Sequence, residues 1–299
     1  MATRRVFIKN TGLFTLSTTV FPFDTSFVTE LDTKVRIGIA TDSHYAERDP
    51  AGTRFYRGAL DKMGEFVRVM NKEKVDFVMH MGDFKDEDET QDEKMTLRYL
   101  RKIEAVYSGF DGPRYHCIGN HDVDSITKTQ FLENIENTGV PKEKSYYSFD
   151  HKGLHIIVLD ANYNKDGTNH YFLKGADWQD TNLTDQQLDW LEEDLKKTSK
   201  PTLVFCHHPL FEFRREGYKF HINDFKKAQR LLEKSGTVLA VLQGHVHEER
   251  YSSINGIQYI TQNGMVDHQG LENNSFSILE VQAGKMQLYG YKRANDVAF

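Results

Sequence analysis

Short apolar runs alternate with helical patterns along most of the chain. Six runs are short, rich in β-branched residues and end in polar residues or glycine, which is typical of buried strands: 35–41, 75–81, 115–118, 154–159, 202–206 and 238–242. Between them, apolar side chains recur at helical spacing in residues 54–71, 90–106, 184–197 and 223–234. Thr184 with Gln187 three residues later predicts a capping box at the start of the third helix.

The last part of the chain has a different pattern, because residues 257–291 alternate apolar and polar positions without a helical segment. Strand–helix alternation followed by a run of strands predicts an α/β fold in which helices cover the sheets. No internal repeat and no linker divides the sequence. We therefore expect one domain over residues 30–299.

The composition is that of a globular protein with a modest negative charge. Its 299 residues contain 38 Lys and Arg against 44 Asp and Glu, a net charge of -6. Because duplex nucleic acid and anionic membranes attract concentrated positive charge, neither is expected as the main partner. No stretch reaches the roughly 18 consecutive apolar residues of a membrane span. Cys117 and Cys206 each end an apolar run and are expected to be free, buried thiols.

Residues 1–29 have the features of an export signal. Arg4 and Arg5 are followed by Phe7, Lys9 and a weakly apolar, Thr-rich stretch at 11–22, an order that resembles a twin-arginine signal. We expect export to the periplasm or secretion by this route. If the segment is instead an N-terminal arm, the protein is cytoplasmic. No small-x-small cleavage site precedes Glu30.

Polar residues with ligand chemistry follow nearly every predicted strand. In chain order these groups are Asp42-Ser43-His44, Gly82-Asp83, Gly119-Asn120-His121-Asp122, His207-His208-Pro209 and Gly244-His245-Val246-His247. Each group alone is ordinary for a turn. Because the carboxyl ends of strands gather at one edge of an α/β sheet, we expect the five groups to meet. Histidines mixed with carboxylates suit first-row ions such as Mn, Fe, Zn, Co or Ni.

The order D-x-H, GD-x-x-D, GNHD, H-x-P and GH-x-H, from Asp42 to His247, resembles the calcineurin-like metallophosphoesterase superfamily. The resemblance implies a four-layer αββα sandwich of two mixed sheets flanked by helices, with a dinuclear metal site at the strand ends. It also implies the ligands: Asp42, His44 and His247 for the first metal, Asn120, His207 and His245 for the second, and Asp83 bridging both.

The same resemblance implies a reaction on a small phosphorylated substrate. Two ions brought close by a bridging carboxylate clamp the attacking and leaving oxygens of a displacement at phosphorus, and a hydroxide that bridges them is the expected nucleophile. His121, beside a ligand but not one itself, is the expected general acid. Asp86, the second aspartate of GD-x-x-D, is expected to fix the tautomer of His121.

The remaining histidines are expected to have other roles. His208 follows His207 directly, and because side chains alternate along a strand we expect it to point away from the metals and to support a ligand. His80, His116 and His155 lie within predicted strands and are expected to be hydrogen-bonded core residues.

Substrate preference must come from loops, and two segments bear on it. Residues 52–57, with Arg54 and Arg57 around two aromatics, resemble the manganese-dependent ADP-ribose/CDP-alcohol diphosphatase branch. If both arginines lie at the metal edge, their guanidinium forks can bind a second phosphate or a terminal carboxylate of the substrate. The alternative is that they form ion pairs on the solvent face of a helix. The aromatic-rich connection 162–183 either caps the site or packs as a separate apolar cluster. Arg214, Arg215 and Lys219 either bind a second phosphate or belong to an exposed loop.

Two other functional classes are compatible with these motifs. A degenerate member of the superfamily would serve as a scaffold that binds a protein partner, which intact ligands at every motif disfavour. A nuclease of the same superfamily is disfavoured by the absence of a basic groove in the sequence pattern. The natural substrate, the metal identity and the oligomeric state stay open.

Overall fold

The computed structural model describes residues 33–299. The export signal expected at residues 1–29 lies outside these residues, and it stays a prediction, as does the domain boundary at residue 30. Within residues 33–299, no helix combines the length and the apolarity needed to cross a bilayer.

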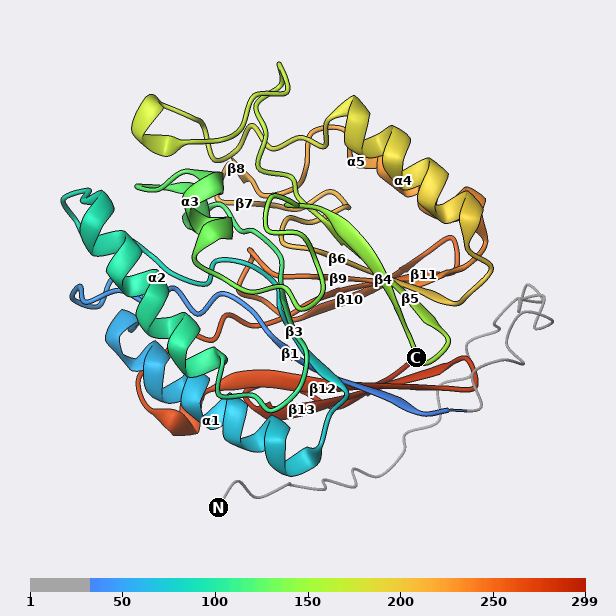
Figure 1. The fold of residues 1–299 in the computed structure, drawn as a ribbon, viewed down its shortest axis with the longest axis horizontal. Coiled ribbons are helices and arrows are strands. Elements are labelled where there is room, and N and C mark those ends of the chain that lie inside the picture. Colours follow the sequence, from blue (N-terminus) through green and yellow to red (C-terminus); the bar gives the residue numbers. More distant parts are fainter. Residues whose placement is uncertain (1–32) are drawn as a thin grey trace.

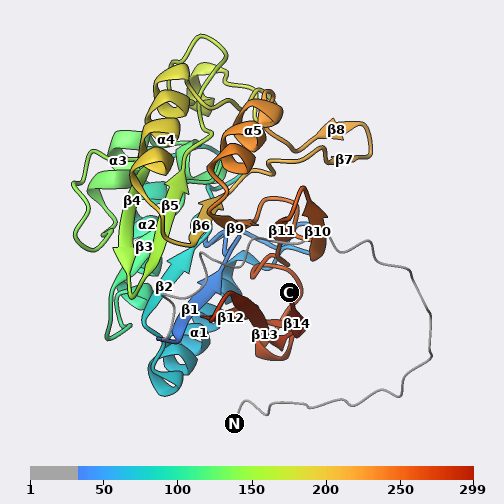
Figure 2. The same cartoon turned by 90° about the vertical axis from the view of Figure 1, so that its right-hand side faces the viewer.

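Two six-stranded mixed sheets form the centre of the molecule (Figures 1 and 2). The first sheet has the order β14-β13-β12-β1-β2-β3, with β1 (Val35–Ala40), β2 (Phe77–His80), β3 (Arg114–His116), β12 (Ser275–Gln282), β13 (Lys285–Lys292) and β14 (Val297–Ala298). The second has the order β10-β11-β9-β6-β5-β4, with β4 (Tyr147–His151), β5 (Leu154–Leu159), β6 (Thr202–Cys206), β9 (Val238–Gln243), β10 (Arg250–Ile254) and β11 (Ile257–Thr261).

Helices cover the outer face of each sheet (Figure 1). On the first sheet lie α1 (Ala59–Glu73) and α2 (Glu93–Tyr107), and on the second lie α4 (Asp185–Lys197) and α5 (Phe225–Ser235). The short α3 (Lys128–Glu133) and the hairpin of β7 (Arg214–Arg215) and β8 (Tyr218–Lys219) lie toward one end. The expected four-layer sandwich is confirmed.

Three apolar clusters hold the four layers together. In β2, Phe77 and Met79 face the second sheet while Val78 faces the helices, and in β6 Leu203 and Phe205 face the first sheet while Val204 faces α4 and α5. This two-residue alternation follows from strand geometry. Both cysteines are free and buried within these clusters, as expected.

Two helices begin later than predicted, and the predicted capping box forms only in part. The helix expected at 54–71 begins only at Ala59, after a 3-10 turn at Tyr56–Gly58, and the one expected at 90–106 begins at Glu93 because Asp92 caps it, accepting from Met95 N at 3.0 Å. The predicted capping box at α4 is wrong in one half. Thr184 caps the helix, but the Gln187 side chain instead binds the backbone N and O of Asp160, at 3.0 and 2.7 Å.

The C-terminal strands divide between the two sheets instead of forming one meander. β10 and β11 extend the second sheet, whereas β12 pairs antiparallel with β1, Val35 opposite Val281. The first sheet is mixed because β1, β2 and β3 are parallel and β12 runs against them, and the second is mixed because β4 and β10 each run against a neighbour.

Candidate metal centre

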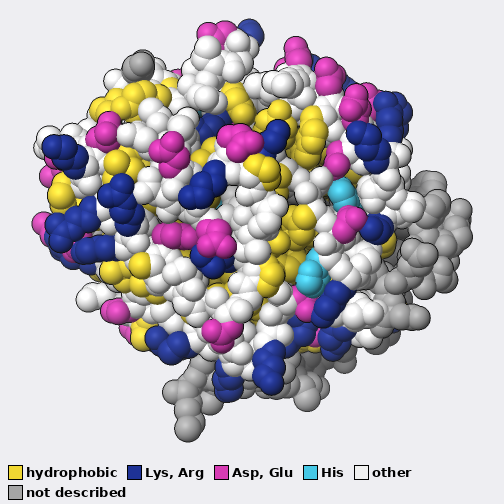
Figure 3. Space-filling model, in the orientation of Figure 1, with side chains coloured by type: hydrophobic (Ala, Val, Ile, Leu, Met, Phe, Trp, Pro, Cys, Tyr) yellow, Lys and Arg dark blue, Asp and Glu magenta, His cyan; other side chains and the backbone are white. Residues whose placement is uncertain are grey.

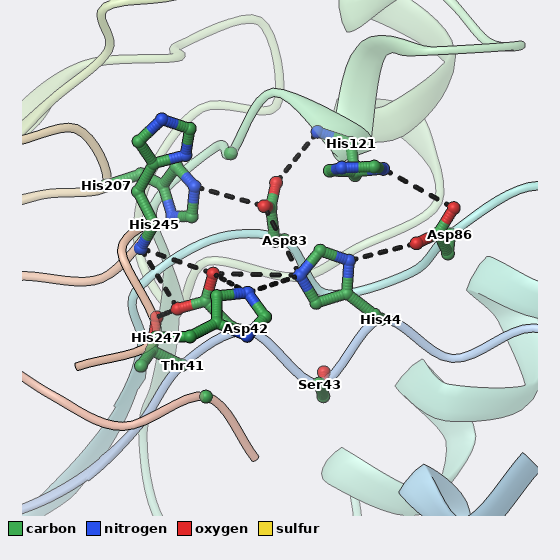
Figure 4. A network of polar contacts seen from close by, with 12 residues as sticks. Thr41, Asp42, Ser43, His44, Asp83, Asp86, His121, His207, His245 and His247 are labelled. Atoms are coloured by element: carbon green, nitrogen blue, oxygen red, sulfur yellow. Dashed lines mark hydrogen bonds and ion pairs between the residues drawn. The ribbon is translucent and has the colours of Figure 1, made fainter. Parts of the chain in front are cut away.

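The seven predicted ligands come from both sheets and meet at one edge. β1, β2 and β3 are parallel to one another, as are β6 and β9, so that the residues following each strand converge. Figure 4 shows Asp83 in the middle, with His207 and His245 on one side and His44 on the other. The structure thus gathers side chains from Asp42 to His247 in one place.

The atoms of the first group face a common point. Asp42 Oδ1 lies 3.2 Å from His247 Nε2 and 3.7 Å from His44 Nε2. The two imidazole nitrogens are 3.1 Å apart. An oxygen and two nitrogens at these separations form a suitable donor set for a first-row cation.

Asp83 is positioned to serve two cations. One of its oxygens, Oδ2, lies 3.4 Å from His44 Nε2 in the first group and 3.2 Å from His207 Nε2 in the second. The other oxygen accepts from the backbone N of His121 at 2.7 Å. The carboxylate therefore lies between the two groups, where a bridging ligand is required.

The second group contains buried ligand atoms that have no hydrogen bond within residues 33–299, although His207 Nε2 lies 3.2 Å from Asp83 Oδ2. Asn120 Oδ1, His207 Nε2 and His245 Nε2 are buried and have no hydrogen-bond partner. Buried polar side-chain atoms are seldom left unpaired. Together with Asp83, these three atoms fit a bound cation, which would supply the missing partner.

The backbone holds several ligands in an uncommon conformation. Asp42, His44, Asp83, His245 and His247 have φ angles of 54°, 46°, 52°, 68° and 52°. Non-glycine residues seldom adopt this left-handed region, at a cost of about 1–3 kcal/mol each. Hydrogen bonds fix the turns, among them Asp42 N to Gly82 O at 3.0 Å and His44 N to Asp83 O at 2.9 Å. The ligand geometry is therefore set before any ion binds.

Two glycines of the motifs are required by close packing. A Cβ atom on Gly119 would lie 2.2 Å from Asp83 N, and one on Gly244 would lie 2.1 Å from Thr41 Oγ1. Neither position accepts a side chain without moving a ligand loop.

Three of the predicted ligand histidines are held by an acceptor at Nδ1, the ring nitrogen that would not bind the metal. His44 Nδ1 lies 3.0 Å from Asp86 Oδ2, His207 Nδ1 lies 2.8 Å from Met81 O, and His247 Nδ1 lies 2.9 Å from Asp267 Oδ2. Such acceptors fix the tautomer and the orientation of a metal-binding imidazole.

Asp267 was not predicted from the sequence. It follows β11 in the same way that the other site residues follow their strands, and this position was the available signal. Its second oxygen accepts from Thr53 Oγ1 at 2.9 Å. The loop that carries it is fixed by the buried Lys62 of α1, whose Nζ donates to the carbonyls of Met265, Asp267 and His268 at 2.7, 2.9 and 2.7 Å.

Asp86 contacts two site histidines at once. Besides His44, its Oδ1 lies 3.4 Å from His121 Nδ1. Burial disfavours the charged imidazole, but Asp86 and Asp83 outweigh it and raise the pKa of His121 to about 9. Burial would likewise raise the pKa of Asp83, yet His207, His121 and His44 hold that pKa well below its ordinary value.

A cavity of about 460 Å³ opens beside these residues. It is lined by Asp83, Asn120, His121 and His245, by the acids Glu87 and Asp124, by the cations Arg54 and Arg215, and by the aromatics Phe172, Trp178, Tyr218 and Phe220. The aromatic side chains come from the connection 162–183 and from the segment of the β7–β8 hairpin. The face of the molecule seen in Figure 3 carries Lys and Arg interspersed with Asp and Glu, without a continuous basic stripe.

The two predicted substrate arginines lie in different places. Arg54 lines the cavity, with Nη1 3.9 Å from Asp86 Oδ2. Arg57 is half exposed and binds Asp49 Oδ1 at 2.8 Å and Glu47 O at 2.9 Å, outside the cavity. Arg57 thus follows the alternative expected from the sequence, an ion pair on the surface, because acidic residues of the preceding loop hold it there.

His208 does not point away from the site. β6 ends at Cys206, so the alternation of a strand no longer applies to the two histidines after it. The ring of His208 is fully buried, with its centroid 5.0 Å from that of His207 and 4.6 Å from that of His245. The prediction of its direction was wrong.

The strand histidines differ in how well they are satisfied. His116 binds Asn137 and Glu104, and His155 binds Asp150 and Asp194, as expected of core residues. His80 has one partner, Ser43 Oγ at 3.0 Å, and its Nδ1 is unpaired.

Comparisons with known proteins agree with this geometry. The calcineurin-like phosphoesterase family matches residues 35–249. A manganese-dependent ADP-ribose/CDP-alcohol diphosphatase of Arabidopsis thaliana is 23% identical over 308 residues, covering 88% of this chain and 96% of the relative. A probable cyclic nucleotide phosphodiesterase of Fibrobacter succinogenes is 25% identical, covering 72% of this chain and 73% of the relative. A solved dimetal phosphatase from Danio rerio has a TM-score of 0.75 at 19% identity, covering 88% of this chain and 98% of its own.

Proposed function

Because the chain belongs to the calcineurin-like phosphoesterase family and is thus a metal-dependent hydrolase of phosphoester bonds, we propose that it acts on small phosphorylated substrates at the centre described above. Asp42, His44 and His247 would hold one metal ion, Asn120, His207 and His245 the other, and Asp83 both. The observation that carries this assignment is the pair of buried ligand atoms without a hydrogen bond, Asn120 Oδ1 and His245 Nε2, together with His207 Nε2 at 3.2 Å from Asp83 Oδ2.

The ions, when bound, supply Lewis acidity at the phosphoryl oxygens and lower the pKa of water. The remaining work falls to the chain. Asp86 holds Nδ1 of His121, which leaves Nε2 as the nitrogen able to donate a proton to the leaving oxygen. Arg54 lies within the same cavity and presents a guanidinium fork to a phosphate.

The metal is proposed to be manganese. The donor set of imidazoles, carboxylates and one amide oxygen accepts Mn, Fe, Zn, Co or Ni. Manganese is favoured because the Arabidopsis relative is named for its dependence on that metal.

The cavity wall favours a nucleotide diphosphate as the substrate. Arg54 and Arg215 can each hold a phosphate, and Trp178 with Phe220 offers aromatic faces, their ring centroids 5.4 Å apart. Both relatives described above are named for nucleotide substrates. A simple phosphomonoesterase would not need the second cation or the aromatic wall.

Chelation and substitution test the metal centre. Exhaustive chelation is expected to abolish hydrolysis of p-nitrophenyl phosphate and of ADP-ribose, and Mn, Co or Ni to restore it. Asp83→Asn is expected to lose most bound metal and nearly all activity, since one ligand of both ions changes. Full activity of this variant with two metals bound would contradict the assignment.

The two arginines form a matched pair for testing the substrate. Arg54→Ala is expected to impair hydrolysis of ADP-ribose or a CDP-alcohol by about 10- to 150-fold, the loss of about 1.5–3 kcal/mol for a charged contact, with little change toward p-nitrophenyl phosphate. Arg57→Ala, outside the cavity, is expected to change neither rate. Equal losses on both substrates with Arg54→Ala would leave a general phosphoesterase as the better assignment.

The N-terminal segment is proposed to direct export by the twin-arginine route, on the support of Arg4 and Arg5 and the weakly apolar stretch after them. Replacing both arginines by lysine is expected to retain the protein in the cytoplasm when cells are fractionated. Unchanged export would contradict the proposal.

A further inference from the structure

Beside the proposed ligands of the second metal lies one additional imidazole, that of His208. One ligand atom each of His207, His208 and His245 lies within 4.8 Å of the others. His207 and His245 are the proposed ligands of the second metal. His208 belongs to the same cluster although no motif position assigns it a role.

The ring of His208 has no protein partner on either nitrogen. Nδ1 and Nε2 are both buried without a hydrogen bond, and the residue is 0% exposed. An unpaired polar group in the interior costs about 1–3 kcal/mol. The rings of His80, His116 and His155, by contrast, each bind at least one protein atom. Something other than the described chain must therefore satisfy His208.

A hydrogen bond holds the segment that carries His208 in place beside the neighbouring strand. The main-chain carbonyl of His208 accepts from Gln243 Nε2 at 3.0 Å, which ties the loop after β6 to the end of β9. The ring stands at 89° to that of His207 and at 52° to that of His245. The three rings are thus not stacked on each other, and one ligand atom of each lies within 4.8 Å of the others.

We propose that His208 is a third imidazole ligand of the second metal ion, beside His207 and His245. This inference rests on the proposed function, because it needs a metal at that position. Two nitrogens bound at about 2.1 Å to one ion lie at most about 4.2 Å apart, so a closing movement of about half an ångström brings all three within reach. With Asn120 and Asp83, the second site would be richer in imidazole than the first, where Asp42 replaces one nitrogen donor.

The test compares metal binding of the wild type with that of His208→Phe. Phenylalanine keeps the planar ring and removes both nitrogens. Because these nitrogens have no protein partner, the melting temperature of the metal-free variant is expected to equal or exceed that of the wild type. The affinity for the second metal, measured by chelator competition, is expected to fall by at least the roughly 10- to 100-fold that loss of a supporting contact alone costs. The rise in melting temperature on adding metal is expected to shrink accordingly.

His80→Phe is the matched control. His80 is also fully buried, and its ring already lies among aromatic neighbours, 4.7 Å from Phe84. It lies in none of the clusters able to hold a metal among the described residues. This variant is expected to bind both metals as the wild type does. A cobalt-loaded sample adds a spectroscopic readout, since losing a nitrogen ligand changes the visible absorption of the ion.

The outcomes separate the two proposals. A wild type that binds no second metal would overturn the proposed function. A wild type with two metals, and a His208→Phe variant with the same affinity and the same cobalt spectrum, would overturn the role of His208 alone. If His208→Phe does not fold, His208→Gln is measured in the same way, and retention of wild-type affinity and spectrum in it equally overturns the proposal.

Discussion

Asp267 contacts the proposed ligand His247 without being a ligand itself, and its substitution tests whether this contact positions His247. Its Oδ2 lies 2.9 Å from His247 Nδ1 and its Oδ1 accepts from Thr53 at 2.9 Å, at 5% exposure. In Asp267→Asn, one oxygen becomes an amide nitrogen that donates instead of accepting, and the negative charge that orients the imidazole is lost. Supporting carboxylates of this kind contribute about 10- to 100-fold to metal affinity, or about 1.4–2.7 kcal/mol.

The measurement is the affinity of each metal site in Asp267→Asn, by competition with a chelator and by metal content after dialysis. We expect the first site, which contains His247, to weaken by that factor, while the second site changes little. Asp194→Asn is the matched control, because Asp194 holds His155 Nε2 at 2.8 Å at the opposite ends of the strands. An unchanged first site in Asp267→Asn, or an equal loss in both variants, would refute the argument that this contact positions His247.

Three further predictions concern the proton donor, the loop under Asp267 and a histidine away from the site. His121→Ala should slow alkyl phosphoesters by about 10²- to 10⁴-fold and p-nitrophenyl esters far less at equal metal content, because a good leaving group needs no proton; equal losses would point to positioning instead. Lys62→Met removes the donor of three carbonyls, of which those of Met265 and Asp267 are buried, and should lower the free energy of unfolding by about 2 kcal/mol or more in a denaturant titration. Lys72→Met, on the exposed end of α1, should change it little. Burial opposes the charge of His155, but Asp194 and Asp150 outweigh it and raise the pKa of the ring. The charged ring therefore stabilises the fold below its unfolded pKa of about 6.5, and this contribution is lost as the pH rises through the higher folded pKa. His155→Gln should lower the denaturation midpoint at pH 5.5 and have less effect at pH 9.

Much of the fold could be predicted, because the apolar runs along the sequence correspond to buried strands of the two sheets. The runs at 154–159 and 202–206 coincide with β5 and β6, since both strands are buried on both faces and end in polar residues. β4 was not predicted, because Tyr147–His151 mixes buried and exposed positions at the edge of a sheet. The pairing of β12 with β1 was not predictable either, since no local signal states which strand a distant strand will join.

The site was predictable where residues follow strands directly and less so elsewhere. Asp42, His44 and Asp83 could be placed from strand ends, and family resemblance supplied their expected roles. The sequence could not decide between the two alternatives for Arg57, because its partners, Glu47 and Asp49, lie in a loop whose path the sequence does not give. His208 was misplaced because a strand rule was extended past the end of the strand.

The pairing of the first strand with β12 has a consequence for how the chain folds. Val35 pairs with Val281, so the first sheet forms only when two residues separated by most of the chain come together. Contacts between residues so distant in sequence make folding slow. During synthesis β1 has no antiparallel neighbour until residues 275–282 have left the ribosome, long after the last proposed ligand, His247, has been made. Until then the edge of β1 is open to pairing with other chains. Assembly of the centre that starts at Asp42 is thus linked to strands that carry none of its ligands.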